Sequence, residues 1–186
     1  HVRSRRQRQM CIRDRIGGAM SSLFRIQLGF PDMDLTALSP IIGNWLTPQG
    51  KIDPEVYLAL ITMHGTIMVF FVLTAGLSGT FSTFLIPLQI GARDMASGFL
   101  NMLSYWFFFL SSIVMFISIF VEGGPASGGW TIYPPLSALP QAVSGSGMGM
   151  TLWLVSMSLF IVSALLGALN YITCLLYTSD AADEIV

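Results

Sequence analysis

Three long apolar stretches, separated by short polar segments, dominate the pattern of this chain. They cover residues 56–88, 98–121 and 148–173. About twenty mostly apolar residues suffice for a helix to cross a bilayer, so each stretch predicts a spanning helix. A shorter apolar piece, 16–28, predicts the end of an earlier spanning helix. The expected fold class is all-α, a partial multi-pass transmembrane helix bundle.

The polar connectors between these stretches predict which side of the membrane each end faces. Residues 29–55 are acidic, 89–97 contain Arg93, and 122–147 are rich in Gly, Pro and Ser. Because basic residues favour the cytoplasmic side, we expect 89–97 to be a cytoplasmic turn. The segments 29–55 and 122–147 are then outer loops.

Both ends of the chain differ from its middle. Six of the nine basic residues lie in 1–15, whereas 174–186 form an acidic tail. The strings MCIRDR and CLLYTSDAADE resemble translated sequencing-adapter DNA, so we expect both segments to be non-native and exclude them from fold reasoning. A basic cytoplasmic arm is the alternative for 1–15. Nucleic-acid binding is not expected, because an Arg run on a membrane chain rarely serves it.

Composition and cysteine spacing indicate which class of protein this is. Charged residues make up 10% of the chain, against about 25% in soluble domains, which indicates a membrane protein. Cys11 and Cys174 form no CxxC pair and no metal-ligand spacing, so we interpret them as unrelated thiols.

His64 is the most informative residue. It is the only histidine apart from His1, and no Asp, Glu, Lys or Arg occurs in 56–92. An ionisable side chain in a membrane-length apolar segment usually faces a protein interior, a cavity or a cofactor. Imidazole also ligates metals and haem iron. Sequence context alone leaves two interpretations open, a cofactor ligand and a hydrogen-bonded packing residue.

Five local motifs, in order, resemble the N-terminal part of subunit I of haem-copper oxidases. They are FRIQL at 24–28, TMHG at 62–65, PLQIGARDM at 87–95, GWTIYPPL at 129–136 and LGALNYIT at 166–173. The resemblance implies that the chain holds the end of one helix and three full helices of a twelve-helix fold.

The resemblance also implies roles at a haem site. His64 matches an axial ligand of the low-spin haem, of haem a type, whose second axial histidine lies on a later helix. Arg25 matches an arginine that hydrogen-bonds a polar substituent of that haem; a snorkelling side chain is the alternative. Trp130 matches a donor to a propionate of the neighbouring high-spin haem, and an interfacial tryptophan is the alternative.

A proton-uptake path is implied as well. Asp94 matches the carboxylate at its cytoplasmic mouth, and the remaining matches are polar positions that hold water: Thr83, Asn101, Ser104, Ser163 and Asn170. The seven-residue spacing of Asp94 and Asn101 is about two helical turns, which makes a shared face plausible. The alternative is a capped, solvated turn. Thr83 stands where asparagine is common in the family, and together with departures at Arg93, Met157 and Ala164 this suggests a bacterial branch.

The implied whole protein is a terminal respiratory oxidase of the bacterial cytoplasmic membrane. It would reduce O2 to water with electrons from cytochrome c and pump protons, with subunits II and III as partners and the lipid membrane around it. The ligands of the high-spin haem and copper B have no counterpart here, so the chain by itself is expected to be inactive. The alternatives are a quinol oxidase subunit I and, in another class, a non-redox transporter bundle.

Overall fold

The structure is a computed structural model that describes residues 2–38, 50–92, 94–121, 123–135, 137–139 and 147–183. Within these ranges every element of regular secondary structure is a helix, as predicted. The elements are α1 (Val2–Gly29), η1 (Thr36–Leu38), α3 (Pro54–Thr66), η2 (Ile67–Ser82), α4 (Thr83–Gln89), α5 (Gly98–Ser118) and α6 (Met148–Asp183). Three helices are long and apolar enough to cross a membrane, namely Pro54–Gly76, Gly98–Ser118 and Met148–Tyr177. These findings confirm the all-α membrane fold.

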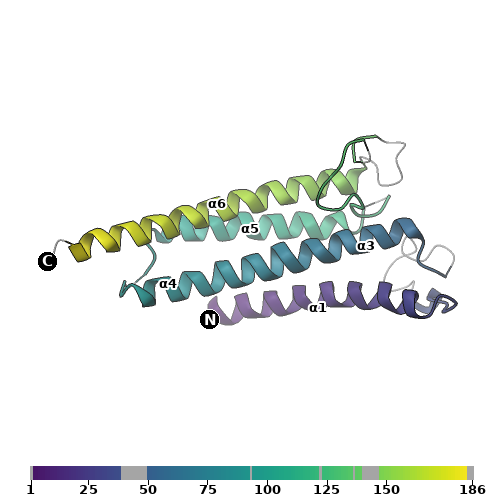
Figure 1. The fold of residues 1–186 in the computed structure, drawn as a ribbon, viewed down its shortest axis with the longest axis horizontal. Coiled ribbons are helices and arrows are strands. Elements are labelled where there is room, and N and C mark those ends of the chain that lie inside the picture. Colours follow the sequence, from purple (N-terminus) through teal and green to yellow (C-terminus); the bar gives the residue numbers. More distant parts are fainter. Residues whose placement is uncertain are drawn as a thin grey trace.

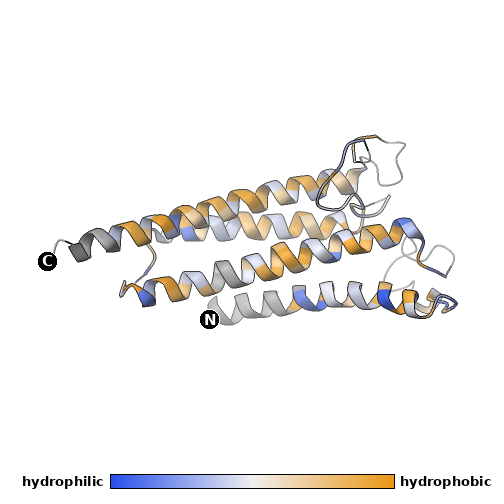
Figure 2. Ribbon diagram, viewed as in Figure 1, coloured by the Kyte–Doolittle hydropathy of each residue, from blue (hydrophilic) through white to orange (hydrophobic). Residues whose placement is uncertain are grey.

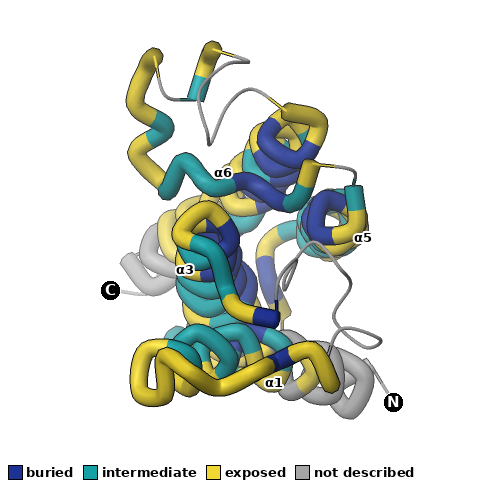
Figure 3. Tube along the Cα trace, turned by 90° about the vertical axis from the view of Figure 1, so that its right-hand side faces the viewer, coloured by how far each residue is buried: buried dark blue, intermediate teal, exposed yellow. Residues whose placement is uncertain are grey.

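The helices form a bundle of long rods (Figure 1). The rod made of α3, η2 and α4 contacts α1 along one side, and α5 packs along α6. Figure 3, which looks along the helices, shows α3 between α1 and the pair α5 and α6. The described parts of 29–55 and 122–147 lie at one end of the bundle, and the turn around 89–97 lies at the other (Figure 1).

Several helix ends differ from those expected from hydropathy. α1 extends back through 2–15, which contain neither Gly nor Pro to stop a helix. α5 ends at Ser118 rather than 121, and the chain beyond it turns through Gly123 and Gly124, whose φ values are 91° and 80°. α6 continues past 173 to Asp183, since no Gly or Pro interrupts it there. Whether 1–15 and 174–186 are native stays a prediction.

The predicted helix 56–88 is an unbroken rod of three segments, from Pro54 to Gln89. Asp53 occupies the N-cap position in an extended conformation, without a capping hydrogen bond from its side chain, and Pro54 takes the first helical position, which proline favours. The middle segment η2 is a π-helix, the wide form in which hydrogen bonds span five residues. The Thr74 hydroxyl follows the same spacing and donates to the Val69 carbonyl at 2.8 Å.

Two pairs of serines, spaced seven residues apart along each helix, join α5 to α6 as a ladder of hydrogen bonds. The Ser104 and Ser163 hydroxyls donate to each other's backbone carbonyls at 2.8 and 2.7 Å. Ser111 and Ser156 repeat this reciprocal pairing, with both distances 2.7 Å. Seven residues are about two helical turns, so the pairs lie along one stripe of each helix. Small side chains allow close approach in lipid, and interhelical hydrogen bonds add stability.

The apolar core lies between this pair and the α3 rod. Its members are mainly methionine and aromatic residues: Met63, Phe71, Met115, Ile119, Ala126, Met150, Trp153 and Phe160. Phe71 and Phe160 have ring centroids 5.5 Å apart. Many residues of the helices are apolar (Figure 2), and several of their side chains are exposed, including those of Phe99 and Leu165, which are 69% and 65% exposed. Such faces need lipid or further helices to cover them.

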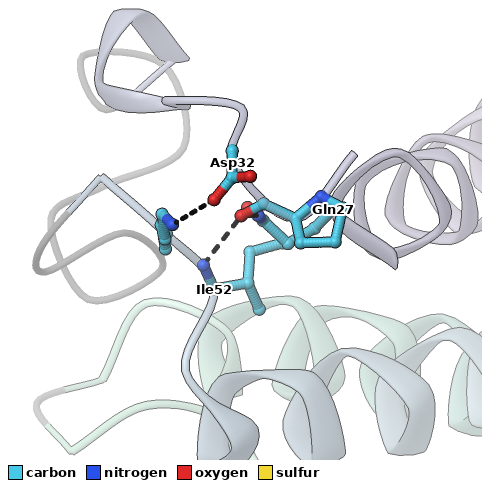
Figure 4. Close-up of polar contacts among 5 residues, drawn as sticks. Gln27, Asp32 and Ile52 are labelled. Atoms are coloured by element: carbon cyan, nitrogen blue, oxygen red, sulfur yellow. Dashed lines mark hydrogen bonds and ion pairs between the residues drawn. The ribbon is translucent and has the colours of Figure 1, made fainter. Parts of the chain in front are cut away.

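Polar contacts close the loop between α1 and α3 (Figure 4). The Gln27 side-chain amide donates to the Pro31 carbonyl at 3.1 Å and accepts from the Ile52 N–H at 3.4 Å. Lys51 Nζ lies 3.3 Å from Asp32 Oδ1, but both side chains are exposed, so this ion pair adds little stability. The amide contacts hold the two loop ends together, which limits how far α1 can slide along α3.

One carboxylate in this loop has a perturbed pKa. The Thr36 hydroxyl and N–H both donate to Asp34 Oδ1. These hydrogen bonds lower the pKa of Asp34 because they favour its charged form, and Lys51 adds a smaller effect in the same direction.

Candidate cofactor-binding site

His64 lies half-buried on α3 and points toward α1. Its Nδ1 is 2.8 Å from the Gly17 backbone carbonyl of α1. A carbonyl oxygen can only accept, so this contact assigns the hydrogen to Nδ1. In the neutral form of an imidazole that carries its hydrogen on Nδ1, the lone pair is on Nε2. A histidine that binds a metal through one nitrogen typically donates the other N–H to such a carbonyl.

The Phe24 ring of α1 also contacts the imidazole. The Phe24 ring meets His64 edge-on, with centroids 5.9 Å apart and an interplanar angle of 70°. Phe24 also packs edge-on against Tyr57 at 5.8 Å. Arg25, the next residue of α1, is exposed. The structure therefore brings His64 against the α1 turns around Gly17 and Phe24, with Arg25 beside them in the chain.

Gly17 permits the close approach that this hydrogen bond requires. A Cβ atom at Gly17 would lie 2.6 Å from Met68 Sδ, closer than real Cβ contacts, whereas one at Gly18 would meet nothing within 4 Å. The glycine therefore lets α1 lie against the rod at the level of His64.

Replacing Gly17 with leucine is expected to push α1 away from Met68 and weaken the Gly17–His64 hydrogen bond. Overpacking of this kind costs about 1–3 kcal/mol. The measurement is the thermal unfolding of the full-length subunit that contains this chain, together with its haem absorption spectrum. Gly18→Leu is the control and should leave both nearly unchanged; equal effects of the two variants would contradict the close approach.

Trp130 lies on another side of α3. A Cβ built on Gly65 would lie 3.2 Å from Trp130 Cζ2, so the indole covers the residue that follows His64. The Trp130 and Phe70 rings are 5.1 Å apart at 63°. Trp130 remains 45% exposed, which leaves part of the indole open to a further group.

The structure brings together part of the predicted proton path. Asn170 is buried and pairs with the Ser97 backbone, accepting from its N–H at 2.9 Å and donating to its carbonyl at 3.0 Å. Ser104 and Ser163 meet in the ladder described above, with hydroxyl oxygens 3.3 Å apart. Because all these contacts join α5 or the residue before it to α6, the path residues are also the packing contacts of this helix pair.

The other residues of the predicted path take no part in these α5–α6 hydrogen bonds. The Thr83 hydroxyl donates to the Gly79 carbonyl at 2.6 Å and lies 3.1 Å from the Tyr171 hydroxyl. Asn101 is half-buried in the first turn of α5, and Asp94 is exposed and accepts from the Met95 N–H at 2.8 Å.

The inferred shared face of Asp94 and Asn101 is wrong. Ser97 caps α5 by accepting from the Leu100 N–H at 3.3 Å, so the helix begins at Gly98. Asp94 lies outside the helix, and helical spacing does not connect it to Asn101.

Sequence reasoning missed three parts of the site. The Gly17 carbonyl has no side-chain signature, and only the Gly17–Gly18 pair inside an apolar helix pointed toward a close approach. Thr62 and Thr66 both bond across to other segments, and their four-residue spacing was the available signal. Across the described residues no group of three or more His, Cys, Asp or Glu side chains gathers.

These helices define an integral membrane protein of the multi-pass helical class, with one imidazole presented between two of its helices. Residues 15–182 match the family described as cytochrome c and quinol oxidase polypeptide I. The chain belongs to this family of haem-copper oxidase subunits, which are oxidoreductases whose full-length members use haem and copper. That membership removes the transporter alternative.

Individual relatives agree with this assignment. The chain is 43% identical over 157 residues to an alternative cytochrome c oxidase subunit 1 from Bradyrhizobium diazoefficiens, covering 84% of this chain and 24% of the relative. It is 37% identical to cytochrome c oxidase subunit 1 from Synechocystis, covering 87% and 25%. It is 36% identical to a heme-copper oxidase subunit I+III from Aeropyrum pernix, covering 84% and 17%. The chain thus spans about a quarter or less of their length.

Proposed function

We propose that this chain is part of the catalytic subunit of a terminal oxidase, which reduces O2 to water with electrons from cytochrome c and pumps protons. The observation that carries the proposal is the His64 geometry, in which Nδ1 donates to the Gly17 carbonyl and Nε2 is left to ligate iron. Family membership and the names of the relatives support the reaction. A quinol is the alternative donor.

In this proposal each residue near His64 has a separate task. His64 Nε2 binds the iron, while the Gly17 carbonyl and the Phe24 ring hold the imidazole in orientation. Arg25 donates to a polar substituent of the macrocycle, and Trp130 donates its single N–H to a propionate of the high-spin haem. A low-spin haem of the a type supplies one-electron transfer when bound.

The polar residues on the opposite side of the bundle suit a proton-uptake path. Asp94 is exposed beyond the end of the α4 rod, where a carboxylate collects protons from water. The Ser104 and Ser163 hydroxyls use their hydrogens on backbone carbonyls, so their oxygen lone pairs remain available to accept from water. Further polar positions are Asn101 on α5, Asn170 on α6 and Thr83 on α4.

The rest of the enzyme is expected to complete the site. Ligands for the high-spin haem, copper B and the second axial position would come from other helices of the subunit. Subunits II and III are the proposed partners, and the name of the Aeropyrum relative, subunit I+III, supports the latter. The proposed location is the bacterial cytoplasmic membrane, where lipid and these partners would cover the exposed apolar faces of α5 and α6.

The donor can be tested with the assembled full-length enzyme. We expect O2 consumption with reduced cytochrome c, accompanied by acidification outside sealed vesicles. Turnover with a quinol but not with cytochrome c would show that the electron donor is a quinol. Absence of O2 consumption with either, in an enzyme that retains its haems, would overturn the proposed reaction.

A further inference from the structure

The outer segment that carries Trp130 is fastened to α3 through one buried threonine. Thr62 is 4% exposed, and its hydroxyl donates to the Leu58 carbonyl at 2.8 Å. The same oxygen accepts from the backbone N–H of Gly129 at 3.1 Å. The hydroxyl therefore satisfies an amide of a segment that is 67 residues away in the chain.

This contact places the next residue, Trp130, directly over α3. Gly129 has φ of +68°, a conformation that glycine adopts without strain, and the chain turns there. The indole then lies on Gly65, the residue after His64, and against Phe70. Gly65 has no side chain that could hold the indole in place. The position of Trp130 therefore depends on the Gly129–Thr62 hydrogen bond and on its contacts with Gly65 and Phe70.

A second threonine, one turn along, fixes the helix on which Thr62 sits. The Thr66 hydroxyl donates to the Thr62 carbonyl at 2.7 Å and accepts from Trp153 Nε1 of α6 at 3.1 Å. Thr66 is fully buried and Trp153 is 3% exposed. The turn 62–66 is consequently tied both to the outer segment and to α6, so it forms a rigid support.

Thr62 does not face the imidazole. Successive α-helical residues are rotated by about 100°, so Thr62 and His64 point in directions about 200° apart. His64 faces Gly17 of α1, while Thr62 faces the outer segment. The direct contact of Thr62 with the outer segment is therefore the one with Gly129, the residue before Trp130.

We propose that Thr62 is a positioning residue that holds Trp130, through the Gly129 amide, at the place where the indole meets the haem propionate. This inference rests on the proposed function for the role of Trp130. It assigns to the first residue of the TMHG motif a task separate from that of His64. One short stretch of α3 then serves two haems, with His64 on one side and Thr62 on the other.

The test compares Thr62→Val with Thr62→Ser in the full-length assembled enzyme. Valine keeps the shape of threonine but removes the hydroxyl, whereas serine keeps it. Thr151→Val is the matched control, because the exposed Thr151 hydroxyl donates one turn back, to the carbonyl of Gly147 just before α6. The first readout is hydrogen exchange of the peptide that contains Gly129. The second is the midpoint potential of the high-spin haem.

We expect Thr62→Val to speed exchange at Gly129 by about tenfold, since the partly buried Gly129 N–H loses its acceptor, and to shift the potential of the high-spin haem. Thr62→Ser and Thr151→Val should change neither. Unchanged exchange in Thr62→Val would overturn the anchor, and faster exchange with an unchanged potential would overturn the positioning role. The low-spin haem spectrum of the same samples tests the His64 assignment independently, so the two failures are distinguishable.

Discussion

Replacing His64 with leucine is expected to abolish the low-spin haem spectrum of the full-length subunit. Leucine offers no lone pair to the iron, and the Gly17 carbonyl loses its donor. Changing a residue that supports a metal ligand typically costs 10–100-fold, so loss of the ligand itself should lower electron transfer by more than about 100-fold. Optical spectra of the reduced enzyme and turnover with cytochrome c measure the two effects.

The matched control for this variant is Leu58→Ala on the same helix. Leu58 is 46% exposed, so its truncation should leave both the spectrum and the turnover nearly unchanged. A normal low-spin haem spectrum in His64→Leu would contradict the ligand assignment. His64 would then be a packing residue held by Gly17.

Replacing Ser156 with leucine is expected to separate α5 from α6. Ser156 is fully buried against Ser111, where the two hydroxyls donate to opposite backbone carbonyls at 2.7 Å. A leucine there overpacks the contact, at a cost of about 1–3 kcal/mol, and also removes the hydrogen bond that the Ser156 hydroxyl donates to the Ser111 carbonyl. The thermal unfolding midpoint of the full-length subunit in detergent should therefore fall clearly.

Ser158, two residues further along α6, supplies the control. It is exposed, and its hydroxyl donates within its own helix to the Leu154 carbonyl at 2.9 Å. Ser158→Leu should leave the midpoint unchanged, because leucine suits a lipid-facing position. Ser111→Ala and Ser156→Ala each remove one hydroxyl-to-carbonyl hydrogen bond, and each should lower the stability by about 0.6 kcal/mol, the average for interhelical hydrogen bonds in membranes. Equal destabilisation by the two leucine variants would contradict the ladder.

The positions of the spanning helices followed from sequence because a membrane imposes their length and composition. The predicted 56–88 differs from Pro54–Gln89 by a few residues only. Helix ends depend instead on local caps, which hydropathy ignores, so the ends of α5 and α6 were misplaced. The π-helix of Ile67–Ser82 had no sequence signal, since a stretch that is apolar on every side shows no period to distinguish 3.6 from 4.4 residues per turn.

The candidate site was predictable where a side chain is chemically unusual for its surroundings. His64 was identified because an ionisable imidazole is costly in an uncharged apolar segment and usually has a functional role there. Its partner was missed because every residue carries a carbonyl, and only the fold selects Gly17. The shared helix face of Asp94 and Asn101 was wrong for a related reason, because helical spacing does not apply before the N-cap at Ser97.

The most direct test of the central assignment is a ligand exchange at His64. His64→Met in the full-length enzyme keeps a side chain that can bind haem iron, and magnetic circular dichroism in the near infrared distinguishes imidazole from thioether ligands. If His64 is an axial ligand, the signal of two imidazoles should give way to that of one imidazole and one thioether, with a raised midpoint potential. An unchanged signal of two imidazoles would show that the iron is held by other residues.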